Sequence, residues 1–162
     1  MEKSQLLVSA KKLVQPTQST ANEFIEKREL LCVLVINRLK MDEHFLKSVA
    51  EEKIRIAFDN TMNFSNFMES LFVIYLPEVF VETSYWAIKT YRPHGFQPDY
   101  WRIHLEIWCS ILKTELTDKS YNEIIPFFEW LMENISVFTE LTNWENCKLK
   151  LEHTLANNSD ND

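Results

Sequence analysis

The feature that most constrains the fold is the scarcity of glycine: Gly95 is the only one among 162 residues, beside five prolines. Sheets joined by tight hairpins need residues that tolerate positive φ at their turns, so a chain this poor in glycine is a weak candidate for a β-rich fold. We therefore predict an all-α protein of six to eight helices joined by short loops. The length suits one domain with a buried core.

Gly95 marks the sharpest corner that the sequence predicts. Pro93 ends the preceding helix because proline cannot continue it, and Gly95 can adopt the positive φ that often follows a helix end. Pro98 suits the first turn of the next helix, where its missing N–H would have no partner in any case. A central helix is therefore predicted from about residue 98 to residue 116.

The central helix carries one broad apolar face. Eight residues at helical spacing lie on this arc: Tyr100, Trp101, His104, Leu105, Ile107, Trp108, Ile111 and Leu112. Because His104 lies near the middle of the arc, its side chain should point inward. Two interpretations are open: a core histidine that is hydrogen-bonded to a neighbour, or a polar group at the end of an apolar ligand cavity.

Charge and targeting signals narrow the class of protein. The net charge is −7, and the lysines and arginines are scattered among more numerous acids. This disfavours nucleic-acid binding, which needs a basic face, and binding to an anionic membrane surface. The N-terminus does not resemble a signal peptide, and no run of about 18 apolar residues predicts a membrane span. Cys32, Cys109 and Cys147 are widely spaced and are predicted to be reduced packing thiols of a cytoplasmic protein.

The ends of the chain are predicted to differ from its body. Residues 1–16 form an N-terminal helical arm that Pro16 closes, and the arm docks on the body or on a second subunit. A frayed terminus is the alternative. One domain spans residues 17–156, and the polar, acidic tail 157–162 should be disordered.

The second predicted helix begins near residue 19 or 20 and ends near residue 40. Its segment 30–36 is apolar on every side. A buried strand would look similar, but the charged flanks favour a helix. In a small domain such a helix must bury more than one face, and a second copy of the chain is the simplest partner for the face that the core does not cover. The sequence therefore predicts a homodimer.

Capping residues and prolines divide the middle of the chain. Asp42 is a predicted N-cap for a helix that reaches about Asn60, and Asn63 or Ser65 caps the next helix. Pro77 then breaks a continuous apolar run, because the residue before a proline is driven out of helical geometry. A further helix should follow from Pro77 to residue 91.

Two capping boxes are predicted near the C-terminal end. Ser120-x-x-Glu123 opens one helix, whose start Pro126 delays or kinks, and Thr142-x-x-Glu145 opens the last one.

In the helix from residue 77 to residue 91, Trp86 and Ile88 are expected on the buried side.

Enzyme signatures are absent from the sequence. There is no glycine-rich phosphate loop, no His-Glu-x-x-His, no Gly-x-Ser-x-Gly and no paired His/Cys metal spacing. The many carboxylates lie on faces that we interpret as solvated. We therefore predict that the protein is not an enzyme. A haem site needs an axial ligand in an apolar pocket, and only His104 and His94 are plausible for this role.

The corner and central helix, from Tyr91 to Trp108 with Gly95-Phe96 followed by Tyr100-Trp101-Arg102-Ile103-His104, resemble the RsbR-type non-haem globin sensor domain. The flanking arm, the helix ending in Arg38-Leu39-Lys40 and a final long helix rich in Phe and Trp agree with this. A narrower resemblance is to plasmid-encoded sporulation-inhibitory proteins of bacilli, which are free-standing copies of the sensor domain of a sporulation histidine kinase. It covers about residues 15–142.

The resemblance implies a globin-like, all-helical and haem-less homodimer. A fatty-acid-like chain would lie in an apolar tunnel where ordinary globins hold haem, and a bound anion such as chloride could accompany it. The protein would inhibit sporulation by competing with the kinase for its signal. Two other interpretations stay open: a haem-binding globin sensor that uses His104 or His94, and a helical adaptor that docks a partner helix without a small ligand.

The expected ligand-binding residues come from the inward helical faces, not from the resemblance. They are Phe72, Ile88, Tyr100, His104, Ile107, Trp108, Ile111, Phe127, Phe128 and Leu131. A carboxylate head group needs a hydrogen-bond donor when it leaves water, and His104, Tyr100 or His94 could supply one. A protonated imidazole would bind it most strongly, so we expect binding to weaken as the pH rises through the pKa of that histidine.

Overall fold

The structure is a computed structural model that describes the backbone of residues 3–159 and the side chains of residues 3–143. Seven α-helices and two short 3-10 helices, without any strand, make up this part of the chain, so the predicted all-α class is confirmed. The elements are α1 (Lys3–Ala10), α2 (Gln18–Met41), α3 (Glu43–Ser48), η1 (Glu51–Lys53), α4 (Ile54–Val73), α5 (Pro77–Tyr91), η2 (Arg92–His94), α6 (Pro98–Glu115) and α7 (Asp118–Ser159).

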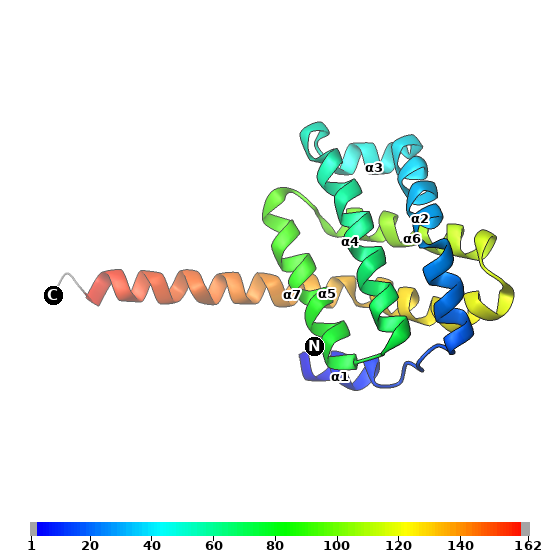
Figure 1. Cartoon of the computed structure of the whole chain (residues 1–162). Helices are drawn as coiled ribbons and strands as arrows, with labels where there is room; N and C mark the ends of the chain where they lie inside the picture. The colour runs from blue at the N-terminus through cyan, green and yellow to red at the C-terminus, as the bar shows by residue number, and fades with distance from the viewer. Residues whose placement is uncertain (1–2, 160–162) are drawn as a thin grey trace.

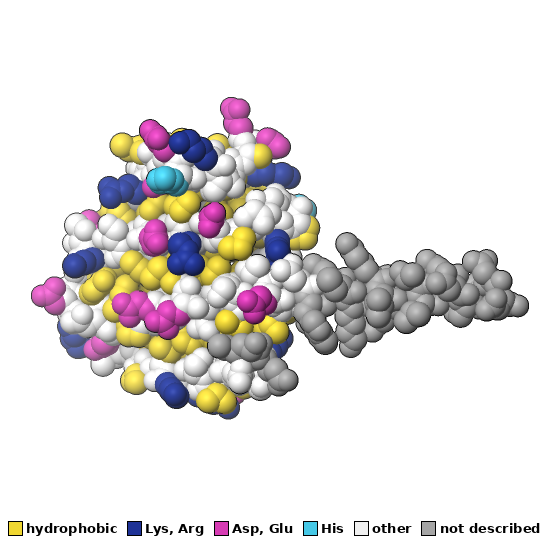
Figure 2. All heavy atoms as spheres, turned by 180° about the vertical axis from the view of Figure 1, so that it is seen from behind, with side chains coloured by type: hydrophobic (Ala, Val, Ile, Leu, Met, Phe, Trp, Pro, Cys, Tyr) yellow, Lys and Arg dark blue, Asp and Glu magenta, His cyan; other side chains and the backbone are white. Residues whose placement is uncertain are grey.

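The helices form a compact body from which the C-terminal part of α7 projects (Figure 1). α2 packs against α4, α6 and α7, and α6 packs along α7. α5 is held mainly by α7 and by the N-terminal α1. Hydrophobic side chains reach the surface in bands on the face opposite to the view of Figure 1 (Figure 2). No helix in the described range is both long and apolar enough to cross a membrane.

Aromatic side chains from four helices fill the centre of the body. Phe72 on α4 meets the ring of Phe24 on α2 edge-on at 4.9 Å and that of Phe127 on α7 at 5.5 Å. Phe127 in turn contacts Phe80 on α5 at 5.9 Å. Edge-to-face pairs of this kind add to the free energy gained from burial alone. All four rings are fully buried, so this cluster ties α2, α4, α5 and α7 together.

The predicted corner at Gly95 is confirmed. Gly95 has φ +96°, and it is the only residue with positive φ in the described chain. Its N–H donates to the carbonyl of Arg92 (3.0 Å), and Phe96 packs its buried ring against those of Tyr91 (5.5 Å) and Tyr100 (4.7 Å). The break at Pro77 and the placement of Pro98 in the first turn of α6 are confirmed as well.

The predicted division of the region 42–65 is wrong. Asp42 does cap a helix, since its carboxylate accepts from the N–H of Phe45 at 2.8 Å, but that helix ends at residue 48. The chain then turns through η1, and α4 runs without interruption past Asn63 and Ser65. Ser65 caps nothing there: its hydroxyl donates back to the carbonyl of Met62 and accepts from Arg28 of α2.

The first predicted capping box is replaced by a cap exchanged between two helices. The N–H and hydroxyl of Thr17, which precedes α2, both donate to Glu123 of α7 at 2.8 Å. Reciprocally, the N–H and hydroxyl of Thr117, which precedes α7, donate to Glu23 of α2 at 2.9 and 2.7 Å. Glu123 therefore accepts hydrogen bonds from the residue that precedes the neighbouring helix α2 and does not cap its own helix.

The second predicted box is wrong because no helix begins there. Thr142 lies inside the continuous α7 and donates to the carbonyl of Thr139 at 2.8 Å. Pro126 is likewise inside α7, eight residues from its start. α7 continues through Ser159, so the first three residues of the expected tail are helical; residues 160–162 lie outside the described range, as does the side chain of Cys147.

The N-terminal arm docks on the body. Lys3 and Lys11 of this segment pair with Glu82 and Glu78 of α5 at 2.7 and 3.2 Å. The side-chain amide of Gln15 donates to the carbonyl of Phe72 at 2.6 Å and its oxygen accepts from the N–H of Tyr75. The arm thereby fixes α5 and the short link between α4 and α5. α1 itself is shorter than expected, ending at residue 10.

The apolar segment 30–36 is helical, as predicted. Leu31 and Val35 are buried against the core, whereas Leu30 and Val33 are 50% and 54% exposed. The face that carries Leu30 and Val33 is thus not covered within one chain. The homodimer expected from it remains a prediction.

Candidate functional site

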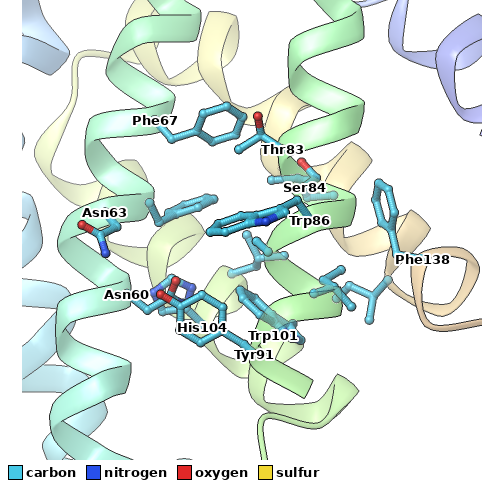
Figure 3. A pocket seen from close by; sticks show the side chains of 16 residues that line it. Asn60, Asn63, Phe67, Thr83, Ser84, Trp86, Tyr91, Trp101, His104 and Phe138 are labelled. Atoms are coloured by element: carbon cyan, nitrogen blue, oxygen red, sulfur yellow. The ribbon is translucent and has the colours of Figure 1, made fainter. Parts of the chain in front are cut away.

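A cavity of about 290 Å³ lies between α4, α5, α6 and α7 (Figure 3). α4 and α5 form its two long sides, and α6 and α7 close it from behind. Its walls are mostly aromatic and aliphatic. The lining residues are Asn60, Asn63, Phe64, Phe67, Thr83, Ser84, Trp86, Ala87, Ile88, Tyr91, Trp101, His104, Leu105, Leu131, Ile135 and Phe138.

Trp86 and Asn63 place the mouth of the cavity between α4 and α5. The Trp86 side chain is 60% exposed and extends from α5 toward α4 (Figure 3). Asn63, on the facing side of α4, is exposed too. Trp86 was expected on the buried side of its helix, and the structure corrects this. An indole at the rim borders both solvent and the cavity.

His104 is fully buried at the inner end of the cavity and is held by two side chains. The indole N–H of Trp108 donates to His104 Nε2 at 3.3 Å, and the hydroxyl of Thr61 lies 3.1 Å from the same nitrogen. An indole nitrogen can only donate, so Nε2 acts as an acceptor, and the proton of the neutral imidazole is assigned to Nδ1. Nδ1 has no partner among the described residues.

The charge state of His104 differs from the expectation. Burial lowers its pKa to about 3, because desolvation penalises the charged form. The imidazole is therefore neutral near pH 7, and a protonated imidazole that binds a carboxylate is not supported. Both earlier interpretations of His104 contain part of the answer: Nε2 is hydrogen-bonded in the core, while the residue also lines the cavity.

Two further polar groups of α4 and α6 belong to this end of the cavity. The side-chain amide of Asn60 donates to the hydroxyl of Tyr100 at 2.8 Å, and burial raises the pKa of that phenol, so Tyr100 is uncharged. Trp101 lines the cavity from α6, and its indole Nε1 is buried without a partner in the described part of the chain. Tyr100 itself lies behind Asn60 and does not line the cavity.

The structure brings only part of the predicted set together. Ile88, His104 and Leu131 line the cavity. Phe72, Ile107, Trp108, Phe127 and Phe128 are buried away from it, and Ile111 is half-buried. Phe72 and Phe127 pack against each other between α4 and α7, and Trp108 and Phe128 pack against each other between α6 and α7.

Sequence reasoning missed most of the α4 and α5 wall. Phe64 and Phe67 lie at helical spacing on an apolar face, but nothing in the spacing separates a face that packs from a face that borders a void. The polar residues Asn60 and Thr83 carried the only usable signal, because each interrupts an otherwise apolar stripe. His94, the other expected donor, is exposed in η2 and does not line the cavity.

The described residues show neither a metal-binding cluster nor a reactive thiol. No group of three or more His, Cys, Asp or Glu side chains that could hold a metal occurs among them. Cys32 and Cys109 are free thiols. Burial raises the pKa of Cys109 to about 12, so its thiol is far from the reactive thiolate form.

Comparisons with protein-family models, with curated proteins and with solved structures give no significant match to this chain.

Proposed function

We propose that the chain is a haem-free, non-enzymatic sensor domain that binds an apolar, chain-like small molecule such as a fatty acid in the cavity between α4, α5, α6 and α7. The cavity carries the proposal: about 290 Å³ bounded by aromatic and aliphatic side chains and a few polar groups. Protein sites for small ligands have this composition, and their volumes begin at about 300 Å³.

The order of elements supports the sensor part of the proposal. The chain has a docked arm, a long second helix, a glycine corner and a central helix with His104 inward, which are features on which the sequence resemblance to globin sensor domains rests. By that resemblance the protein would bind the same signal as a sporulation sensor histidine kinase. Competition for this signal would inhibit sporulation.

The proposed domain acts as a homodimer. The supporting observation is the apolar face of α2, on which Leu30 and Val33 are half exposed beside a buried opposite face. Exposed apolar side chains that share one helix face favour contact with a partner. A second copy of the chain is the simplest partner.

Haem binding is a second candidate that the geometry favours less. Iron would need a histidine nitrogen directed into the cavity. His104 Nε2 is already in contact with Trp108 and Thr61, Nδ1 carries the proton of the neutral ring and has no lone pair for iron, and His94 lies outside the cavity. An absorption spectrum of the purified protein with a strong Soret band would favour haem over the apolar chain.

The test uses a variant whose enlarged side chain on α5 occupies the cavity. Delipidated wild-type protein is titrated with a fluorescent fatty acid, and Ala87→Trp, which adds an indole at a lining position, is compared with Thr90→Trp, which adds the same group at an exposed position of the same helix. We expect saturable one-to-one binding by the wild type and by Thr90→Trp, and loss of binding by Ala87→Trp. Extraction of the natively purified protein, followed by mass spectrometry, identifies the natural ligand.

Absence of saturable binding of both the fluorescent fatty acid and its uncharged methyl ester in the wild type would refute the proposed function. Equal binding by the wild type and Ala87→Trp would place the ligand elsewhere. In that event, the apolar surfaces would favour the adaptor interpretation, in which a partner helix and not a small molecule is bound.

A further inference from the structure

Two N–H groups on the inner wall of the cavity are buried and have no partner in the described chain: Trp101 Nε1 and His104 Nδ1. Their residues are three positions apart on α6 and both line the cavity, so they lie side by side on the same helix face. A buried donor that is left unpaired loses its hydration without compensation, and native structures contain few such groups. Two of them on one cavity wall indicate an absent partner that accepts hydrogen bonds.

The His104 donor cannot be satisfied by turning its own ring over. His104 keeps its proton on Nδ1 as long as Trp108 donates to Nε2 at 3.3 Å. The ring is fixed by aromatic neighbours, with Phe64 at 5.4 Å and Tyr100 stacked at 5.7 Å. Turning the imidazole over would leave the Trp108 N–H without an acceptor. The same number of unpaired groups would result.

The wall around these donors is uncharged. No lysine, arginine, aspartate or glutamate is among the residues that line the cavity, and His104 itself is neutral at pH 7. An ionised carboxylate at this position would be buried beside uncharged donors only. Removing an unpaired charge from water is strongly unfavourable, whereas an uncharged carbonyl loses much less hydration and can accept both hydrogen bonds.

We propose that the cavity selects an apolar chain that carries an uncharged carbonyl group, whose oxygen accepts hydrogen bonds from Trp101 Nε1 and His104 Nδ1. This inference rests on the proposed function and specifies the ligand class for the same site. Esters and ketones of medium or long chains fit this description. A fatty acid fits it in its protonated form.

The experiment measures, at about pH 8, displacement of the fluorescent fatty acid's methyl ester, which is uncharged, by 2-dodecanone, by dodecanoate and by decane. We expect the ketone to displace the probe at a concentration at least about tenfold lower than either of the others. Trp101→Phe, which removes one donor and keeps an aromatic ring, should weaken ketone binding about fivefold, the effect of one lost hydrogen bond. Trp130→Phe is the matched control: it makes the same exchange on α7, outside the cavity, where the indole N–H donates to Ser9 of the arm.

A second readout is independent of any variant. The infrared carbonyl stretch of the ketone bound to the wild type should lie at lower wavenumber than in an alkane solvent, because hydrogen bonding weakens the C=O bond. A ketone that binds with an unshifted stretch would overturn the inference. So would dodecanoate that binds more tightly than the ketone, or equal ketone affinity in the wild type and Trp101→Phe. If no chain compound binds at all, the proposed function fails instead.

Discussion

Lowering the pH should destabilise the protein through His104. Desolvation lowers the pKa of this fully buried side chain to about 3, whereas an unfolded histidine titrates near 6.5. Below about pH 6.5 the unfolded chain binds a proton that the folded chain does not. The stability is therefore fully present above that pH and is lost progressively down to about pH 3. The side chains in contact with the ring, Thr61, Phe64, Tyr100 and Trp108, supply no charge that would offset this.

One proton corresponds to a slope of about 1.4 kcal/mol per pH unit within this window. Between about pH 6.5 and pH 5, the free energy of unfolding should fall by about 2 kcal/mol through His104 alone. Domains of this size are stable by about 5–15 kcal/mol, so the loss is large enough to measure.

The assay is urea unfolding at about pH 7.5, 6 and 5 for the wild type, His104→Gln and His94→Gln. Glutamine does not titrate and offers an oxygen that can accept from Trp108. His94 is exposed and serves as the matched control. Contributions from the carboxylates are shared by all three proteins and cancel in the comparison. The reasoning is refuted if the wild type and His104→Gln lose equal stability between the highest and the lowest pH.

Three other changes test the corner, the exchanged caps and the dimer. Gly95→Val should lower the melting temperature, at a cost of about 1–3 kcal/mol, because φ is +96° although nothing lies within 4 Å of an added Cβ; an unchanged melting temperature contradicts this. Glu23→Gln should flatten the dependence of stability on pH below about pH 4.5. Desolvation raises the pKa of Glu23, but hydrogen bonds from Ser120, Lys27 and Thr117 outweigh it and lower the pKa to about 2. The stabilisation by Glu23 is therefore lost as the pH falls from about 4.5 to 2, and the exposed control Glu26→Gln should leave the slope unchanged. Val33→Glu should convert the proposed dimer to monomer in sedimentation without unfolding; a dimer that persists places the interface elsewhere.

The parts of the fold that follow from local chemistry could be predicted from the sequence. Gly95 and Pro98 determine the corner through their own φ preferences, and Pro77 ends the preceding helix through the residue before it, so no distant contact is needed. The inward orientation of His104 follows equally from helical spacing along α6.

The caps failed as predictions because a carboxylate near a helix start has more than one possible partner. The spacing of Ser120 and Glu123 permits a capping box, but Glu123 lies beside Thr17 once α2 and α7 pack together. An acceptor that serves a neighbouring helix still satisfies an N-terminal N–H, so the same rule of backbone satisfaction operates through a tertiary contact. No local pattern contains that contact.

The cavity could not be predicted for a different reason. An apolar helix face has the same sequence pattern whether it meets another face or a void, and the side chains of Phe127 and Phe64 are equivalent in this respect. The position of α5 decides which of the two side chains packs against other residues and which borders the cavity. The arm and α7 hold α5, and the bonds of Gln15 to the α4–α5 link fix its start, so α5 does not close on α4. The arm lies far in sequence from α4 and α5, the two long sides of the cavity.

The energetics of the cavity argue against an empty interior. At about 24 cal/mol per Å³, a closed and dry void of about 290 Å³ would cost about 7 kcal/mol, a large share of the stability of a single domain. The mouth at Trp86 allows solvent or a ligand to enter, and an apolar ligand removes more of this cost than water does. A ligand at 100 times its Kd should raise the free energy of unfolding by about 2.7 kcal/mol. Ala87→Trp should lose this ligand-induced gain while Thr90→Trp keeps it, since only the first occupies the space that the ligand would fill.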